Sequence, residues 1–234
     1  MINYAHRGAS EYAPENTFSA FYLGLEMGVD GIETDVRMTR DGKLVLFHDG
    51  VLDRVTDRSG AFHDVSYEQL KAMKITGKNP DAVPDCIVTL EDFLKYFAFR
   101  GLRLAIELKD ENIEKEVLAL IREYQAEDAV EITSFCFKNL RRMRELSPAV
   151  TLGYLVEAVD DRVVGDFRSI GGQQICPKAD GLTPELVARL KEQGFSVRAW
   201  GVSDEKVMEK AIACGVDGMT VNFPDKLTEY LRKS

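Results

Sequence analysis

The chain has 234 residues, 45% of them hydrophobic, and a formal net charge of −9. This length suits one large α/β domain as well as two small ones, and because the basic residues form no run or stripe, nothing indicates a nucleic-acid-binding protein. No apolar run approaches the ~18 residues that span a bilayer, and no export signal is visible. We therefore expect a cytoplasmic protein with no stable membrane insertion and with reduced thiols at its cysteines.

Short β-rich runs alternate with amphipathic stretches along the chain, which is typical of parallel strands joined by crossover helices. The expected strands cover residues 2–6, 31–36, 103–109, 130–134, 151–156, 173–176, 196–201 and 217–221. The expected helices cover residues 15–27, 89–99, 112–125, 137–146, 183–193, 203–214 and 224–232, with a weaker helical signal at 157–172. This alternation predicts an α/β fold, a closed (β/α)₈ or TIM barrel. A doubly wound open sheet is the alternative, although no G-x-G-x-x-G follows the first strand.

One segment departs from this regular alternation. Asp41-Gly42 is typical of a hairpin turn, and residues 43–48 alternate like an extra strand. Residues 49–88 then contain no convincing core strand, and the stretch is too long for a plain βα loop. We expect a single domain over residues 1–234, with an insertion subdomain at about 49–88 packed over one end of the barrel.

Acidic side chains alternate along the second and third expected strands. Since side chains alternate between the two faces of a strand, Glu33 and Asp35 share one face. Glu107 and Lys109 share a face in the same way, and the opposite faces are largely apolar, so the charged side chains should point into the barrel. Three inward carboxylates would repel one another, and one divalent cation, Mg²⁺ or Ca²⁺ with Mn²⁺ as a further candidate, removes this conflict. The alternative is that each pair lies on a solvated strand face.

Two of the three histidines stand at the ends of expected strands. His6 ends the first strand and His48 ends the hairpin strand, beside the proposed cation. An unperturbed imidazole pKa of about 6.5 suits proton transfer near neutrality, so the two form a candidate acid-base pair. His63, in the insertion, has no such context and is interpreted as structural.

Several other residues are candidates for contacts to an anionic substrate. The guanidinium of Arg7 matches the geometry of phosphate oxygens, with a surface salt bridge as the alternative. An inward Lys109 needs an anionic partner, either the carboxylates or a substrate phosphate. Trp200, the only tryptophan, is a candidate floor for a glycerol-sized pocket or else a core aromatic. Asn222, just past the last strand, is a weaker pocket candidate.

The order and spacing of these residues resemble a known family, the glycerophosphodiester phosphodiesterases. The similarity spans nearly the whole chain. Residues 157–176 are less typical of the family, so the resemblance does not define the pocket wall near Cys176 and Lys178. The matching blocks are His6-Arg7-Gly8-Ala9-Ser10, Pro14-Glu15-Asn16-Thr17, Glu33-Thr34-Asp35-Val36, Thr39-x-Asp41-Gly42, His48-Asp49, Ile106-Glu107-Leu108-Lys109, Ser134-Phe135 and the strand with Trp200.

The resemblance implies a (β/α)₈ barrel with a small insertion after the second strand, and one divalent cation. By the same resemblance, the metal ligands fall on Glu33, Asp35 and Glu107, and the acid-base pair falls on His6 and His48. Arg7 and Lys109 approach the substrate phosphate, and Glu15, near the start of the first helix, lies at the rim of the metal site. Together with the pocket candidate Trp200, these three are the expected substrate-binding residues.

The implied reaction is hydrolysis of a glycerophosphodiester to sn-glycerol 3-phosphate and an alcohol, with water or the substrate's own 2-hydroxyl as nucleophile. Alternatives are a lysophospholipase D that acts on monoacyl glycerophospholipids, and a non-catalytic phosphodiester-binding protein. The implied partner is a small-molecule substrate, with no nucleic acid, and the sequence indicates no particular oligomeric state.

Overall fold

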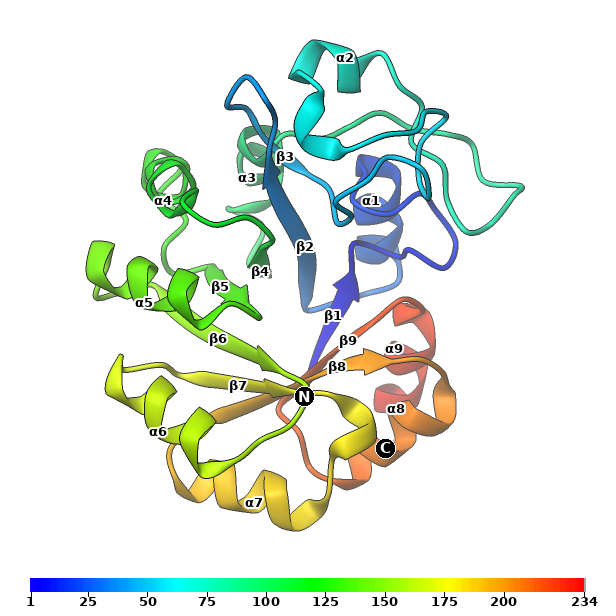
Figure 1. The fold of residues 1–234 in the computed structure, drawn as a ribbon. Coiled ribbons are helices and arrows are strands. Elements are labelled where there is room, and N and C mark those ends of the chain that lie inside the picture. The colour runs from blue at the N-terminus through cyan, green and yellow to red at the C-terminus, as the bar shows by residue number, and fades with distance from the viewer. Residues whose placement is uncertain (234) are drawn as a thin grey trace.

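Parallel strands close into a barrel in the computed structural model, which describes residues 1–233 (Figure 1). Strand β1 pairs with both β9 and β2, and this double pairing closes the ring. The barrel strands of the described residues are β1 (Ile2–His6), β2 (Gly31–Met38), β4 (Arg103–Leu108), β5 (Val130–Ser134), β6 (Thr151–Val156), β7 (Gln174–Pro177), β8 (Ser196–Val202) and β9 (Gly218–Val221).

Helices between these strands form an outer layer around the barrel (Figure 1). They are α1 (Phe18–Glu26), α3 (Leu90–Phe97), α4 (Glu114–Glu123), α5 (Phe137–Leu146), α6 (Asp161–Ser169), α7 (Pro184–Glu192), α8 (Glu205–Ala213) and α9 (Pro224–Lys233). A short 3₁₀ helix, η2 (Ala179–Gly181), precedes α7. The predicted (β/α)₈ barrel is therefore confirmed, and the weak helical signal at 157–172 corresponds to α6.

The first helix begins later than predicted, at Phe18 rather than at residue 15. Asn16 has a left-handed backbone, with φ at 57°, which a continuing α-helix does not accommodate. Thr17 then caps the helix, since its side chain accepts a hydrogen bond from the backbone N–H of Ala20. The residues before Phe18 are consequently free to contribute side chains to the end of the barrel.

Alternation along the strands separates the core from the barrel interior. The apolar positions of β2 and β4 pack under the helices in one large hydrophobic cluster, which includes Ile32, Val36, Leu104, Ile106 and Leu108. The positions between them face the interior. Because this alternation holds in both strands, it directs their acidic residues inward.

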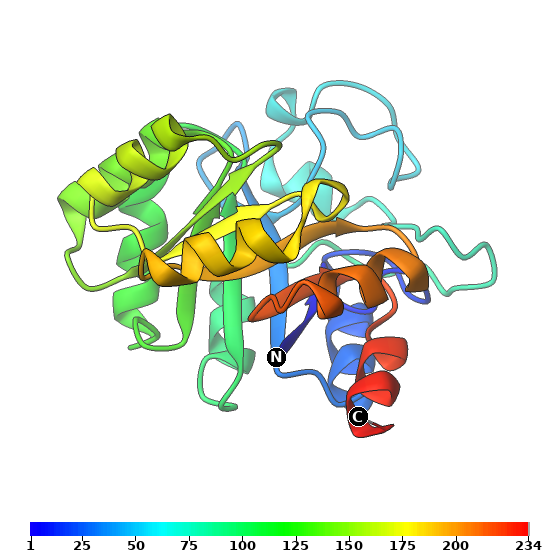
Figure 2. The ribbon, with the colours of Figure 1, turned by 90° about the horizontal axis from the view of Figure 1, so that it is seen from below.

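Residues between β2 and α3 form a segment outside the barrel, in the region where an insertion was predicted. Strand β3 (Leu44–Leu46) pairs antiparallel with β2, and the 3₁₀ helix η1 (Phe62–Asp64) and helix α2 (Tyr67–Lys71) follow it. Figures 1 and 2 show this segment projecting from one side of the molecule. It has its own cluster of buried apolar side chains, namely Val45, Phe47, Leu52, Val55, Phe62, Leu70, Ile75 and Ile87.

Among residues 1–233, no helix has both the length and the apolar character needed to cross a lipid bilayer.

Candidate active site and metal centre

Seven of the nine predicted site residues line one cavity of about 190 Å³, and the other two, Asp35 and Glu15, are not part of its lining. His6 is the last residue of β1, Glu33 and Asp35 lie on β2, and Glu107 lies near the end of β4, so the cavity opens at the carboxyl ends of the strands. This end of a (β/α)₈ barrel carries the active site in characterised enzymes of the fold. The cavity is lined by His6, Arg7, Glu33, His48, Glu107, Lys109, Phe135, Leu155, Arg198, Trp200, Gly201 and Thr220.

Three carboxylates meet beside this cavity, as the alternation of the strands predicts. Glu33, Asp35 and Glu107 each offer an oxygen, and these oxygens all lie within 4.8 Å of one another. All three residues are buried. Burial first, and then the charge of Asp35, raise the pKa of Glu33 to about 8 and that of Glu107 to about 7. The cluster therefore resists full ionisation unless a positive charge joins it.

Asp35 shows that this cluster fits a cation. Burial alone would raise its pKa, but the charges of Arg7 and Lys109 outweigh burial and hold the pKa below its ordinary value. Its Oδ1 atom is buried and has no hydrogen-bond partner among residues 1–233; Lys109 Nζ lies 3.5 Å away. A buried carboxylate oxygen without a donor is unfavourable, and an all-oxygen donor set suits hard divalent cations. Glu33, Asp35 and Glu107 can thus hold a divalent metal.

Asn16 fixes the other oxygen of Asp35. Its Nδ2 donates to Asp35 Oδ2 over 3.0 Å, and its Oδ1 accepts from Thr34 Oγ1 over 2.7 Å. Asn16 thus combines a left-handed backbone with a side chain that binds two residues of β2. The sequence showed Asn16 only as part of the Pro14–Thr17 block, and its role was not predicted.

His6 is held in one tautomer. Its Nδ1 lies 2.6 Å from Asn222 Oδ1, which also accepts from Ser10 Oγ over 3.0 Å. Since an amide oxygen only accepts, His6 Nδ1 carries the proton and Nε2 presents its lone pair, 3.8 Å from Glu33 Oε2. Burial first, and then the charge of Arg7, lower the pKa of His6 to about 3. His6 is therefore a neutral imidazole near neutral pH.

His48 has a carboxylate partner instead of an amide. Its Nδ1 lies 2.5 Å from Asp49 Oδ1, and Arg37 Nε donates to its backbone carbonyl over 3.0 Å. Burial lowers the pKa of His48, and the nearby charge of Asp35 opposes that shift. Burial would raise the pKa of Asp49, but hydrogen bonds from Arg54 and His48 hold it at about 2. Asp49 is thus an ionised orienting partner, whose role the sequence did not reveal.

The two predicted phosphate-binding cations both contact carboxylates. Arg7 Nη1 donates to Glu15 Oε1 over 2.8 Å, and its Nε lies 3.0 Å from Asp35 Oδ2. Lys109 Nζ donates to Glu107 Oε1 over 2.7 Å. Glu15 is buried behind Arg7, so the structure brings it to a cation and not to the carboxylate cluster. Arg7 and Lys109 line the cavity, where an anion would meet them.

Two aromatic side chains, Trp200 and Phe135, form another part of the cavity wall. Trp200 Nε1 donates to the backbone carbonyl of Val156 over 3.1 Å, and its ring meets that of Phe135 edge-on with centroids 4.9 Å apart. Lys178 Nζ lies 5.3 Å from the Trp200 ring centroid, whereas Cys176 is buried inside the barrel. This wall is apolar, in contrast to the charged side around β2 and β4.

Arg198 is a buried cation in the lining of the cavity that the sequence did not single out. Its Nε donates to Gln174 Oε1 over 2.9 Å, and its guanidinium lies 5.0 Å from the ring centroid of Tyr4. Tyr4 in turn donates to the carboxylate of Glu131. These contacts join four different strands, so no local sequence pattern predicts them.

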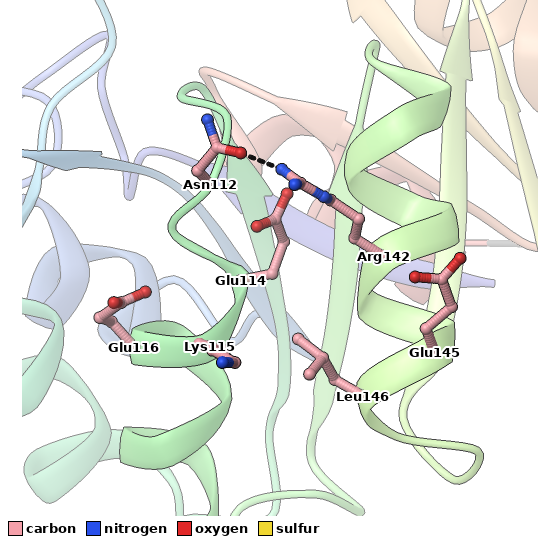
Figure 3. Close-up of a pocket in the computed structure, with 7 residues that line it drawn as sticks. All are labelled: Asn112, Glu114, Lys115, Glu116, Arg142, Glu145 and Leu146. Atoms are coloured by element: carbon pink, nitrogen blue, oxygen red, sulfur yellow. Dashed lines mark hydrogen bonds between the residues drawn. The ribbon is translucent and has the colours of Figure 1, made fainter.

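A second cavity, of about 280 Å³, lies between the start of α4, with Asn112 just before it, and helix α5 (Figure 3). Arg142 donates to Asn112 there, and the lining carries charges of both signs. The lining residues are Asn112, Glu114, Lys115, Glu116, Arg142, Glu145 and Leu146. This set contains no imidazole, whereas the cavity beside β2 is lined by His6 and His48.

Known proteins resemble this chain along its full length. The sequence model of the Glycerophosphoryl diester phosphodiesterase family matches residues 6–226. The glycerophosphodiester phosphodiesterase of Caldanaerobacter subterraneus subsp. tengcongensis is 32% identical, with 98% of this chain and 97% of that protein covered. The enzyme of the same name from Bacillus altitudinis is 34% identical, with 95% of each chain covered.

A solved structure agrees with these matches. The phosphodiesterase of Oleispira antarctica, determined in complex with the product sn-glycerol-3-phosphate, superposes with a TM-score of 0.90 at 27% identity and covers 99% of this chain and 97% of its own. Fold, sequence and site geometry point the same way. The chain is a phosphodiesterase that belongs to the glycerophosphoryl diester phosphodiesterase family.

Proposed function

We propose that this protein hydrolyses glycerophosphodiesters to sn-glycerol 3-phosphate and an alcohol, with one divalent cation and with His6 and His48 as the acid-base pair. The observation that carries the proposal is the meeting of three buried carboxylates and two histidines at one cavity. The product bound in the Oleispira antarctica structure supports the same substrate class.

Glu33, Asp35 and Glu107 would hold the cation. When bound, a Mg²⁺, Ca²⁺ or Mn²⁺ ion supplies positive charge that stabilises the phosphoryl oxygens in the transition state. Arg7 and Lys109 line the same cavity and have N–H groups for the remaining phosphate oxygens. The charged side of the cavity would therefore take the phosphate, and the wall of Trp200 and Phe135 would take the carbon part of the substrate.

The two histidines have different hydrogen-bond partners, and this difference assigns a separate proton transfer to each. His6, neutral and with Nε2 free, takes the proton of the attacking hydroxyl as the new P–O bond forms. His48, whose protonated form Asp49 stabilises, gives a proton to the alkoxide as the bond from phosphorus to the alcohol breaks. The attacking hydroxyl belongs either to water or to the glycerol C2, and the second route passes through a cyclic phosphate.

Phe135 favours a second candidate activity, that of a lysophospholipase D. This side chain is 42% exposed at the cavity and packs on Trp200, so the cavity has an apolar edge where an acyl chain would lie. The cavity itself, at about 190 Å³, matches a deacylated substrate better. We therefore place glycerophosphodiesters first.

A substrate panel tests the proposal. Purified protein with added Mg²⁺, Ca²⁺ or Mn²⁺ is incubated with glycerophosphocholine, glycerophosphoethanolamine and lysophosphatidylcholine, and the products are identified by mass spectrometry. The expected result is sn-glycerol 3-phosphate from the first two substrates, at a higher rate than lysophosphatidic acid from the third. Faster turnover of the monoacyl substrate would favour the second activity, and no turnover of any substrate would contradict both.

A further inference from the structure

Arg54 binds two carboxylates at once from the segment that follows β3. Its Nη1 and Nη2 atoms donate to the two oxygens of Glu15 over 2.6 and 2.7 Å. Its Nε and Nη2 atoms donate to the two oxygens of Asp49 over 2.6 and 3.1 Å. One planar guanidinium therefore makes two bidentate pairs, a geometry that an ammonium group cannot reproduce.

Each carboxylate that Arg54 binds also holds a group at the cavity. Asp49 accepts from His48 Nδ1 over 2.5 Å. Glu15 accepts from Arg7 Nη1 over 2.8 Å, and Arg7 Nε lies 3.0 Å from Asp35. A continuous set of contacts thus runs from Arg54 to one histidine on one side and to the carboxylate cluster on the other.

The backbone of Arg54 is anchored by the core of its own segment. Leu52 and Val55, on either side of it in sequence, are buried in the second hydrophobic cluster. The position of that segment therefore fixes where the guanidinium sits, although the side chain of Arg54 itself is 41% exposed.

We propose that Arg54 is a positioning residue that orients His48 through Asp49 and Arg7 through Glu15, and that the segment between β3 and α3 takes part in the reaction by this route. The role rests on the proposed phosphodiester hydrolysis. Glu15 is buried and would keep only Arg7 as a side-chain hydrogen-bond donor within residues 1–233, so the loss of Arg54 disturbs the geometry of the site. With Arg54 removed, Asp49 keeps only His48 as a side-chain partner within residues 1–233, and its carboxylate can turn toward solvent.

Two substrates with different leaving groups separate this role from a general structural one. Glycerophosphocholine expels an alkoxide that needs a proton from His48, whereas the p-nitrophenyl ester of glycerol 3-phosphate expels a phenolate that leaves without one. Arg54→Ala should lower kcat on glycerophosphocholine by about 100-fold, within the usual contribution of general acid catalysis, and by less than about 10-fold on the p-nitrophenyl ester. KM should rise on both substrates because Arg7 is less well held.

Arg58→Ala is the matched control. Arg58 lies in the same segment and is exposed, and its side chain makes no hydrogen bond or ion pair within residues 1–233. This control should keep the wild-type kcat and KM on both substrates. Arg54→Lys should fall between wild type and Arg54→Ala, because one ammonium cannot span both carboxylates.

The role is overturned if Arg54→Ala behaves like Arg58→Ala, or if its kcat falls by the same factor on both substrates. Should Arg54→Ala fail to fold, as judged by circular dichroism, kcat of Arg54→Lys is measured on the same two substrates. An unchanged kcat, or an equal fall on both substrates, would then overturn the role. A wild-type protein that hydrolyses neither ester would overturn the proposed function itself, and this role with it.

Discussion

Asp35 on β2 and Glu107 on β4 are direct partners across two adjacent parallel strands, and each faces into the barrel. Glu33, two residues before Asp35, completes the cluster and is itself the partner of His6 across β1 and β2. Strand register alone therefore sets the three carboxylates and one histidine side by side. Without a bound cation, the three carboxylates of this arrangement repel one another.

The cation-free protein should lose stability as the pH rises. Burial first, and then the charges of Asp35 and Glu107, raise the pKa of Glu33 from 4.5 to about 8. Between these values the folded state keeps a proton that the unfolded chain has released, so stability falls as the pH rises through this window. Glu33→Gln should remove this part of the loss.

Thermal unfolding in EDTA at about pH 5 and about pH 8.5 tests whether stability falls as the pH rises. At the higher pH, the Tm of Glu33→Gln should exceed that of wild type by several degrees. At the lower pH, the two Tm values should differ little. An equal difference in Tm at both pH values would show that Glu33 is not the group responsible.

The two histidines should respond differently to the leaving group. Replacement of His48 by Ala should lower kcat by ~10²–10⁴-fold on glycerophosphocholine, the range of general acid catalysis, and far less on the p-nitrophenyl ester of glycerol 3-phosphate. His6→Ala should lower kcat on both esters, because each needs the attacking hydroxyl to be deprotonated. The reverse pattern in steady-state kinetics would exchange the two roles.

Asn222 should affect the rate through His6. Its Oδ1 accepts the proton-bearing Nδ1 of His6, so Asn222→Ala removes the bond that selects the tautomer. The expected loss in kcat is about fivefold, equivalent to one net hydrogen bond of about 1 kcal/mol. Ser10→Ala is the control, since it removes only the second donor to the same oxygen and should change kcat little. A pair of variants with equal kcat would contradict this role of Asn222.

The sequence predicted the barrel and the carboxylate cluster because both follow from local alternation. Side chains two apart on a strand share a face, so Glu33 and Asp35 had to point together once the apolar face of β2 was assigned. Helix α2 was not predicted, since five residues are too few to show a helical period. Its capping box, Ser66 with Gln69, was the only local signal available.

The residues that orient the site could not be predicted from sequence. Asn16, Asp49 and Arg54 act through partners that come together only when the chain folds, with Glu15 and Arg54 separated by 39 positions. The sequence indicated Asn222 only as a pocket candidate. Its hydrogen bond to His6 is visible in the structure alone. Hydrogen-bond partners depend on side-chain direction at loop positions, where no period of two or 3.6 constrains them.

Titration of the reaction rate with cation is the most direct test of a metal centre on Glu33, Asp35 and Glu107. Protein freed of metal by chelation is titrated with Mg²⁺, Ca²⁺ or Mn²⁺ while release of sn-glycerol 3-phosphate is followed, in wild type and in Glu107→Gln. The chelated wild type should be inactive and recover with cation, and Glu107→Gln should need at least ~10-fold more cation for half-maximal rate. Full activity after exhaustive chelation, or identical titration curves for the two proteins, would contradict the assignment of these carboxylates to a catalytic cation.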